Sequence, residues 1–225
     1  MHQKFVIIVA GGTGSRMQSK IPKQFIEING EPVIIRTINF FLKYDPTIQI
    51  IISVHFDFKI HLQELIIKYN LNKYKIKITV GGDTRFQSVK NGLELVDNND
   101  AIVGIHDAAR PFVSLQTVKN CFDTANEKGN AVPCITISES LRKVEKEKNS
   151  SVNRNDYKII QTPQCFLVSK IKKAFLQEYD PAFTDDASVL ETTGEKINLV
   201  EGNVENIKIT NQFDLAIAKA LLHNE

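Results

Sequence analysis

Short runs of valine and isoleucine alternate along this chain with longer amphipathic segments, and this alternation restricts the fold more than any other feature. The runs are continuously apolar, as in "FVIIVA" at residues 5–10, instead of alternating with polar residues. Continuous apolar strands are typical of sheets that are covered on both faces. The sequence therefore predicts an α/β fold, with a Rossmann-like, mostly parallel sheet and helices on both faces.

The apolar and amphipathic segments also indicate where each element lies. The predicted strands cover residues 5–10, 48–54, 76–80, 101–108, 131–137 and 197–202. The predicted helices cover residues 32–44, 56–70, 85–96, 114–129, 167–179 and 211–223. In such a sheet, ligands bind in the crevice beyond the carboxyl ends of the strands. The segments that directly follow the strands are therefore the first places to look for a site.

Length and composition predict one domain over residues 1–225 and exclude several classes of protein. With 225 residues, 42% of them hydrophobic, the chain can bury a substantial core. Its 28 basic and 26 acidic residues give a net charge of +2, without the basic excess of a nucleic-acid binder. The 3 cysteines are too widely spaced for a metal motif or a disulfide framework, and the first apolar run is too short to span a membrane. We expect a cytoplasmic protein with neither a nucleic-acid nor a membrane partner.

Residues 138–157 interrupt the pattern with the mostly polar segment "SESLRKVEKEKNSSVNRNDY". One interpretation is a solvated loop or hairpin, as most charged runs are. The other is a β-arm that projects from the core and either covers a site or contacts a second subunit. The residues by themselves leave both open.

A glycine-rich loop, "AGGTGSRM" at residues 10–17, follows the first predicted strand, and basic residues follow the loop. Backbone without side chains can approach an anion closely, and Arg16 and Lys23 could neutralise it, so phosphate is the expected ligand. A dinucleotide-binding loop would need glycine in place of Met17, and the Gly-Lys-Ser/Thr of a P-loop is missing. A glycine turn with solvated basic residues remains the alternative.

Two segments after later strands carry further polar groups. "GGDTRFQSV" at 81–89 opens a helix with glycine backbone, a carboxylate and a hydroxyl, which could read a nucleobase; a helix start capped by aspartate is the alternative. "IHDAARP" at 105–111 ends the most apolar strand with Asp107 and Arg110. A carboxylate there could orient a substrate or bind Mg²⁺, while an N-cap role for Asp107 and a packing role for His106 are the alternatives.

Seven motifs in this chain occur together in one known family. They are "AGGTGSRM", "PKQF", "GGDTRFQSV", "HDAARP", "QTPQCF", "TDDAS" and "NIKIT". In this order and at about these separations they resemble the 2-C-methyl-D-erythritol 4-phosphate cytidylyltransferase family of the nucleotidyltransferase-like superfamily, over nearly the whole chain. Ribitol-5-phosphate cytidylyltransferases share several of the motifs and are an alternative, although "TDDAS" favours the erythritol family. A catalytically silent nucleotide-binding protein on this fold is a further alternative.

The resemblance implies a reaction and a set of residues for it. CTP and 2-C-methyl-D-erythritol 4-phosphate would give 4-diphosphocytidyl-2-C-methyl-D-erythritol and pyrophosphate, with Mg²⁺, in non-mevalonate isoprenoid biosynthesis. The implied catalytic cations are Arg16, Lys23 and Lys208. The implied nucleotide-binding residues are Ala10, Gly11, Gly12, Gly14, Gly82, Asp83 and Ser88. The implied acceptor-binding residues are Asp107, Arg110, Ser140, Arg154 and Thr162.

The resemblance also implies how the metal and a second subunit take part. Mg²⁺ would be held mainly by the CTP phosphates, with Asp107 as its candidate protein ligand. The chain would form a homodimer through the β-arm at about residues 138–157. Arg110 and Ser140 would then reach across the dimer to the acceptor, while Arg154 and Thr162 would line the pocket.

Overall fold

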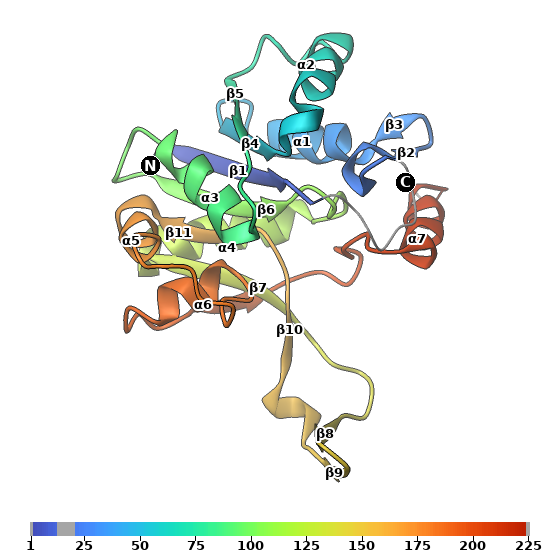
Figure 1. Ribbon diagram of the computed structural model, residues 1–225, viewed down its shortest axis with the longest axis vertical. Coiled ribbons are helices and arrows are strands. Elements are labelled where there is room, and N and C mark those ends of the chain that lie inside the picture. The colour runs from blue at the N-terminus through green and yellow to red at the C-terminus, as the bar shows by residue number, and fades with distance from the viewer. Residues whose placement is uncertain (1, 13–20, 224–225) are drawn as a thin grey trace.

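The computed structural model describes residues 2–12 and 21–223, and within these ranges eight strands form one central sheet (Figure 1). The strands are β1 (Lys4–Ala10), β4 (Gln49–Val54), β5 (Ile76–Val80), β6 (Ile102–Asp107), β7 (Asn130–Thr136), β10 (Lys158–Ile160), β11 (Gln164–Leu167) and β12 (Leu199–Glu201). Their order is β10-β7-β11-β6-β1-β4-β5, and β12 pairs with β7. Strands β5, β4, β1 and β6 are mutually parallel, whereas β11 is antiparallel to both β6 and β7. The predicted mostly parallel sheet is confirmed.

Helices cover both faces of this sheet, as predicted. They are α1 (Val33–Tyr44), α2 (Lys59–Lys68), α3 (Arg85–Glu94), α4 (Leu115–Lys128), α5 (Val168–Ala174), α6 (Asp186–Glu191) and α7 (Gln212–His223). Shorter elements are the 3₁₀ turns η2 (Lys23–Phe25), η3 (Phe56–Phe58) and η4 (Arg154–Asp156) and the small β2 (Glu27–Ile28) and β3 (Glu31–Pro32) pair. None of the helices in the described ranges is long and apolar enough to cross a membrane.

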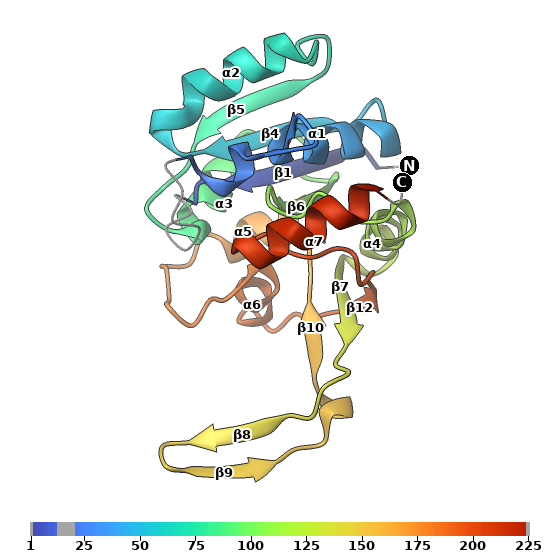
Figure 2. The ribbon, with the colours of Figure 1, turned by 90° about the vertical axis from the view of Figure 1, so that its right-hand side faces the viewer.

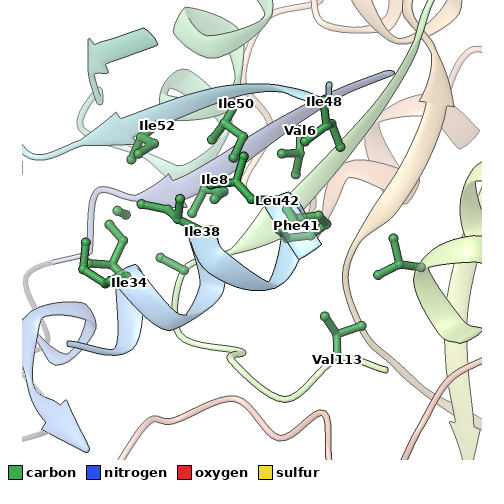
Figure 3. Close-up of a cluster of buried hydrophobic side chains, with 14 of the residues drawn as sticks. Val6, Ile8, Ile34, Ile38, Phe41, Leu42, Ile48, Ile50, Ile52 and Val113 are labelled. Carbon is green, nitrogen blue, oxygen red and sulfur yellow. The ribbon is translucent and has the colours of Figure 1, made fainter. Parts of the chain in front are cut away.

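The continuous apolar runs are explained by two separate cores, one on each face of the sheet. On β1, Val6 and Ile8 point into a cluster with α1, α2 and α4, and Figure 3 shows Ile8 next to Ile38 of α1. Their neighbours on the same strand pack on the other face against α3, α5 and α6. Because successive side chains of a strand face opposite sides, a strand buried on both faces must be apolar throughout.

Strands β10 and β11 and helix α6 were not predicted from the sequence. Strands β10 and β11 pair with the same edge of β7, Ile160 opposite Cys134 and Cys165 opposite Ala131. Residues 161–163 interrupt the two strands: the Gln161 N–H still donates to the Pro133 carbonyl of β7, and Thr162 accepts a hydrogen bond from the backbone N–H at the end of β6. Strands this short, separated by polar and proline residues, carry no periodic signal of their own. The interruption is nevertheless what brings Thr162 to the carboxyl end of the sheet.

The segment at 138–157 forms a β-arm that extends away from the sheet and its helices (Figures 1 and 2). Its tip is a hairpin of β8 (Arg142–Glu145) and β9 (Lys148–Ser151), which is a sheet of its own. Every residue of these two strands is exposed. The prediction of a projecting β-arm is confirmed.

Candidate functional site

Two pockets lie side by side beyond the carboxyl ends of the parallel strands. The first, of about 250 Å³, adjoins the residues that follow β1 and β5. The second, of about 260 Å³, lies between the end of β6 and the segment after β10. Both are lined by Arg85, Asp107 and Lys208, so these side chains form the boundary between the pockets. A molecule in one pocket would therefore contact a molecule in the other at this charged boundary.

The first pocket is bordered by two glycine-containing loops that close on Ser88 of α3. The Gly82 N–H donates to the Ser88 hydroxyl over 3.1 Å, and that hydroxyl donates to the Thr84 carbonyl over 2.9 Å. A Cβ on Gly11 would lie 3.1 Å from Ser88 Oγ, and one on Gly82 would lie 2.5 Å from Gln87 Cβ. Only residues without a side chain fit so close to α3, so backbone groups line this side of the pocket. The expected residues Ala10, Gly11, Gly12, Gly82, Asp83 and Ser88 all line it.

The 3₁₀ turn η2 brings a cation and an amide to the glycine-rich loop. Lys23 lines the first pocket. The next residue, Gln24, is buried, and its side-chain Nε2 donates to the carbonyls of Ala10 over 2.7 Å and Gly12 over 3.0 Å. Because both amide protons are used, Gln24 holds the two ends of this stretch of backbone in place. The "PKQF" motif thus supplies both the charge and the support for the loop.

The second pocket contains Asp107, Arg110, Thr162 and Lys208 from four different segments. The Asp107 N–H donates to Thr162 Oγ1 over 3.1 Å, and Lys208 Nζ lies 2.9 Å from Asp107 Oδ2. Arg110 Nε lies 3.4 Å from the same carboxylate oxygen, and Arg110 Nη1 donates to the Asn206 carbonyl over 2.7 Å. The structure brings Asp107, Arg110, Thr162 and Lys208 of one chain together in this pocket.

Asp107 remains ionised in this environment although it is buried, with only 7% of its surface exposed. Burial alone would raise its pKa, but the charges of Arg85, Lys208 and Arg110 outweigh burial and hold the pKa far below the usual range of a carboxyl group. Arg85 Nε lies 3.6 Å from Asp107 Oδ1. Burial alone would lower the pKa of Arg85, but the carboxylates of Asp186 and Asp107 raise it above its ordinary value. Two cations, Arg85 and Lys208, thus meet the Asp107 carboxylate at the boundary between the pockets, and Asp186 pairs with Arg85 from outside it.

His106 has a larger role than the packing role considered from the sequence. The fully buried ring lies edge-on to Phe41, with ring centroids 5.0 Å apart, but both of its nitrogens are also within hydrogen-bonding distance of polar atoms. Nδ1 is 3.1 Å from Thr162 Oγ1, and Nε2 is 3.0 Å from the Arg110 carbonyl. Since a carbonyl only accepts, we assign the proton to Nε2, and Nδ1 then accepts from the Thr162 hydroxyl. Neutral His106 thus holds two acceptor-pocket residues.

The structure places the remaining expected residues elsewhere. Ser140 and Arg154 belong to the β-arm, where Arg154 Nη1 donates to the Ser138 carbonyl, and the described lining of the two pockets includes neither. We expected Arg110 to reach across a dimer and Arg154 to line the pocket. In the structure, Arg110 contacts Asp107 of its own chain and lines that pocket, whereas Arg154 is not in the described lining of either pocket. The physical reason is the direction of the β-arm, which leads away from the sheet (Figure 2). The expected residues Gly14 and Arg16 lie outside the described residues.

Three side chains of the site were missed by reasoning from the sequence, namely Gln24, Arg85 and Asn206. Each lies inside a quoted motif, "PKQF", "GGDTRFQSV" or "NIKIT", so motif membership was the signal that could have indicated them. Asn206 is fully buried, and its Nδ2 donates to the Thr162 carbonyl over 2.9 Å. It thereby connects the segment that carries Lys208 to the segment that carries Thr162.

Comparisons with known proteins agree with one another over almost the whole chain. The family model described as IspD, 2-C-methyl-D-erythritol 4-phosphate cytidylyltransferase, matches residues 4–224. The protein of that name from Phocaeicola vulgatus is 45% identical over 219 residues, covering 97% of this chain and 99% of the relative. The one from Bacteroides fragilis is 47% identical over 216 residues, covering 96% and 98%.

Solved structures give the same result. The 4-diphosphocytidyl-2C-methyl-D-erythritol synthase of Anaerococcus prevotii superposes with a TM-score of 0.85 at 26% identity, covering 99% of this chain and 96% of that one. The 2-C-methyl-D-erythritol 4-phosphate cytidylyltransferase of Francisella tularensis superposes with a TM-score of 0.76 at 31% identity, covering 97% and 99%.

The buried imidazole predicts a pH dependence of stability. Burial lowers the pKa of His106 from 6.5 to about 4, against the opposing effect of its bond to the Arg110 carbonyl. Between these values the unfolded chain binds a proton that the native chain does not. The free energy of unfolding should therefore decrease as the pH falls from 6.5 to 4, by up to about 1.4 kcal/mol per pH unit. Urea unfolding across this range measures it, and His106→Gln should lose this slope; an unaltered slope in the variant would contradict the assignment.

Proposed function

The chain belongs to the 2-C-methyl-D-erythritol 4-phosphate cytidylyltransferase family, and we propose that its two adjoining pockets hold the two substrates of that reaction. The enzyme transfers CMP from CTP to 2-C-methyl-D-erythritol 4-phosphate in isoprenoid biosynthesis, forming 4-diphosphocytidyl-2-C-methyl-D-erythritol and pyrophosphate. CTP occupies the pocket of the glycine-rich loop, and the acceptor occupies the pocket of Asp107 and Thr162. The observation that carries this assignment is that Arg85, Asp107 and Lys208 form a charged boundary shared by both pockets.

The reaction is an in-line displacement at the α-phosphorus of CTP. A phosphate oxygen of the acceptor forms the new P–O bond while the bond to pyrophosphate breaks. Phosphoryl transfers of this kind depend mainly on positioning and on fixed charges that stabilise the transition state. Lys23 and Arg16 neutralise the triphosphate from the side of the glycine-rich loop. Lys208, which lines both pockets and lies against Asp107, neutralises the attacking phosphate.

Cytosine is selected largely by backbone groups. The loops of Ala10 and Gly11 and of Gly82 and Asp83 border the first pocket, and Ser88 holds them together. Backbone donors and acceptors at fixed positions can match the polar edge of one base and leave another unpaired, which costs binding energy. Gly12 also lines this pocket, and we assign Gly14 of the same motif to binding of the phosphates.

The acceptor is held by groups of opposite charge. The ionised Asp107 carboxylate accepts hydrogen bonds from the hydroxyls of the polyol, and Arg110 and Lys208 contact its phosphate. Thr162 is fixed between the Asp107 N–H and the His106 ring, so it holds the backbone of Asp107 in position.

The residues present fit a Mg²⁺ ion that arrives with the triphosphate. The described residues contain no group of three or more histidine, cysteine, aspartate or glutamate side chains able to form a protein cage for a metal. Mg²⁺ is commonly bound by one or two carboxylates together with substrate phosphates, and Asp107 is a carboxylate that reaches both pockets. Bound there, the ion would reduce the negative charge of the phosphates.

The β-arm joins two copies of the chain into a homodimer. Its exposed Val144 is 70% accessible, and Tyr157 and Ile159 at its base are each 45% accessible, which suits a contact with a second copy. Ser140 and Arg154 then reach the acceptor pocket of the partner subunit. We further propose a cytoplasmic location, which the free thiols of Cys121, Cys134 and Cys165 suit.

The substrate assignment is tested by pyrophosphate release with CTP and Mg²⁺. We expect turnover with 2-C-methyl-D-erythritol 4-phosphate and at most slow turnover with ribitol 5-phosphate, because the site must match the hydroxyls as well as the phosphate. Preference for ribitol 5-phosphate would reverse the acceptor assignment, and silence with both would favour the nucleotide-binding alternative.

Lys23→Ala should lower kcat by roughly 10² to 10³ with a smaller change in the KM for CTP, because the lysine stabilises the transition state more than the ground state. Steady-state kinetics measure this split. Lys128→Ala, at an exposed position at the end of α4, is the matched control and should leave both constants unchanged. A variant with normal kcat and weakened CTP binding would show that Lys23 is only a binding group.

Shortening the β-arm should produce monomers. The Val152 N–H donates to the Leu141 carbonyl, so residues 142–151 can be replaced by two glycines without moving either end. Analytical ultracentrifugation should then show a monomer, and the acceptor KM should increase. A dimer of unaltered strength would exclude the β-arm as the contact.

A mixing experiment tests whether the arm residues act across subunits. Arg154→Ala impairs the pocket that the arm serves, and Lys23→Ala impairs the pocket of its own chain. A mixed dimer combines one Arg154→Ala subunit with one Lys23→Ala subunit. The Arg154→Ala subunit keeps its own Lys23 and would receive an intact Arg154 from its partner, so one complete pocket forms and activity should recover on mixing. Absence of recovery, in dimers shown to exchange subunits, would place Arg154 in the pocket of its own chain.

A further inference from the structure

The "TDDAS" motif at 184–188 has no role in the reaction as described so far, yet it carries a buried carboxylate at the start of α6. Asp186 is 1% exposed. Its Oδ1 and Oδ2 accept hydrogen bonds from Arg85 Nη1 and Nη2, each over 2.7 Å. Two parallel bonds between a guanidinium and a carboxylate determine direction as well as distance. Arg85 is therefore held in one orientation by Asp186.

That orientation directs the Nε of the guanidinium toward Asp107 in the acceptor pocket. Arg85 Nε lies 3.6 Å from Asp107 Oδ1, on the opposite carboxylate oxygen from Lys208. The guanidinium is rigid and planar, so the position of its two terminal nitrogens determines the position of Nε. Asp186 is not among the described residues that line either substrate pocket. Asp186 instead contacts Arg85, which lines both pockets and whose Nε faces Asp107.

The turn that carries Asp186 is itself fixed against the sheet. Asp185 caps α6 by accepting from the Ser188 N–H over 2.9 Å. Gln164 of β11 donates to Asp185 over 2.7 Å and accepts from the Ala187 N–H over 2.8 Å. These bonds on both sides of Asp186 leave its carboxylate little freedom to move. The acceptor pocket is thus supported by a rigid chain of contacts that runs from β11 through α6 to α3.

Stability alone is a poor explanation for this ion pair. A buried ion pair is often no more stabilising than well-packed apolar side chains of similar volume, because both charges must leave water. Apolar side chains could fill the same space between α3 and α6, but they could not hold Asp107 at a fixed position. The contact of a fixed Arg85 with Asp107 is therefore a property that apolar side chains would not supply.

We propose that Asp186 is a positioning residue for the acceptor: through the guanidinium of Arg85, it fixes the Asp107 carboxylate that binds the polyol hydroxyls. The inference rests on the proposed function of the acceptor pocket. Both terminal nitrogens of Arg85 are already bonded to Asp186, so the pair as a whole has no net charge with which to attract the triphosphate. Loss of the pair should therefore weaken use of the acceptor much more than binding of CTP.

The test replaces the pair by apolar residues and compares folding, CTP binding and acceptor use. In the double variant Arg85→Met with Asp186→Leu, we expect a melting temperature close to that of the parent. Because Arg85 also lines the CTP pocket, the Kd for CTP is measured calorimetrically in Asp186→Asn, where we expect it to stay within about threefold. The kcat/KM for the acceptor should fall at least about tenfold, mostly through KM. The matched control is Lys170→Met with Glu195→Leu, which removes a 2.8 Å ion pair distant from the pockets and should leave the acceptor KM unchanged.

Asp186→Asn provides a second variant should the double variant fail to fold. It preserves the shape of the side chain while removing its charge, and it should also raise the acceptor KM with CTP binding retained. An acceptor kcat/KM within twofold of the parent, in either folded variant, would overturn the proposal. Failure of the proposed function would look different, because the parent enzyme itself would then not turn over 2-C-methyl-D-erythritol 4-phosphate.

Discussion

A single buried carboxylate, Asp107, organises the site. It ends β6, and the cations of Arg85, Arg110 and Lys208 converge on it from α3, from the segment after β6 and from the segment before α7. A buried charge is tolerated only when it is paired, and this pairing in turn fixes the cations that surround it. The two substrate pockets meet at this carboxylate. Its position at the end of a central strand is what allows elements from both faces of the sheet to contribute to one site.

Neutral side chains hold the backbone around this charged centre. Gln24 binds the carbonyls of Ala10 and Gly12 in the glycine-rich loop, and His106 connects Thr162 with the Arg110 carbonyl. Such contacts carry no charge, so they add geometric precision without altering the electrostatic balance that a triphosphate requires. The enzyme therefore separates two tasks: the cations provide attraction, and buried amides and imidazole determine where the attracting groups lie.

Much of the fold could be predicted because its signal is local. A strand covered on both faces must be apolar throughout, and this property revealed β1, β4 and β6. Strands β10 and β11 escaped because their pairing with β7 depends on residues about 25 to 35 positions away in the sequence, a relation that no local pattern records. Helix α6 escaped for a related reason, since its six residues are fewer than two turns of helix and its cap is fixed by Gln164 of a distant strand.

The sequence by itself determined the α/β class, the glycine-rich loop and the family, because these depend on residue types at short separations and on the order of motifs. Only the tertiary structure decided which charged groups meet. Arg85 and Asp186 are 101 positions apart and form a bidentate pair, while Arg110 turns into the pocket of its own chain and Arg154 does not. The physical reason is that a charge acts through distance in space. Where the chain returns on itself, as it does around Asp107, that distance is set by packing of the whole sheet and not by position along the sequence.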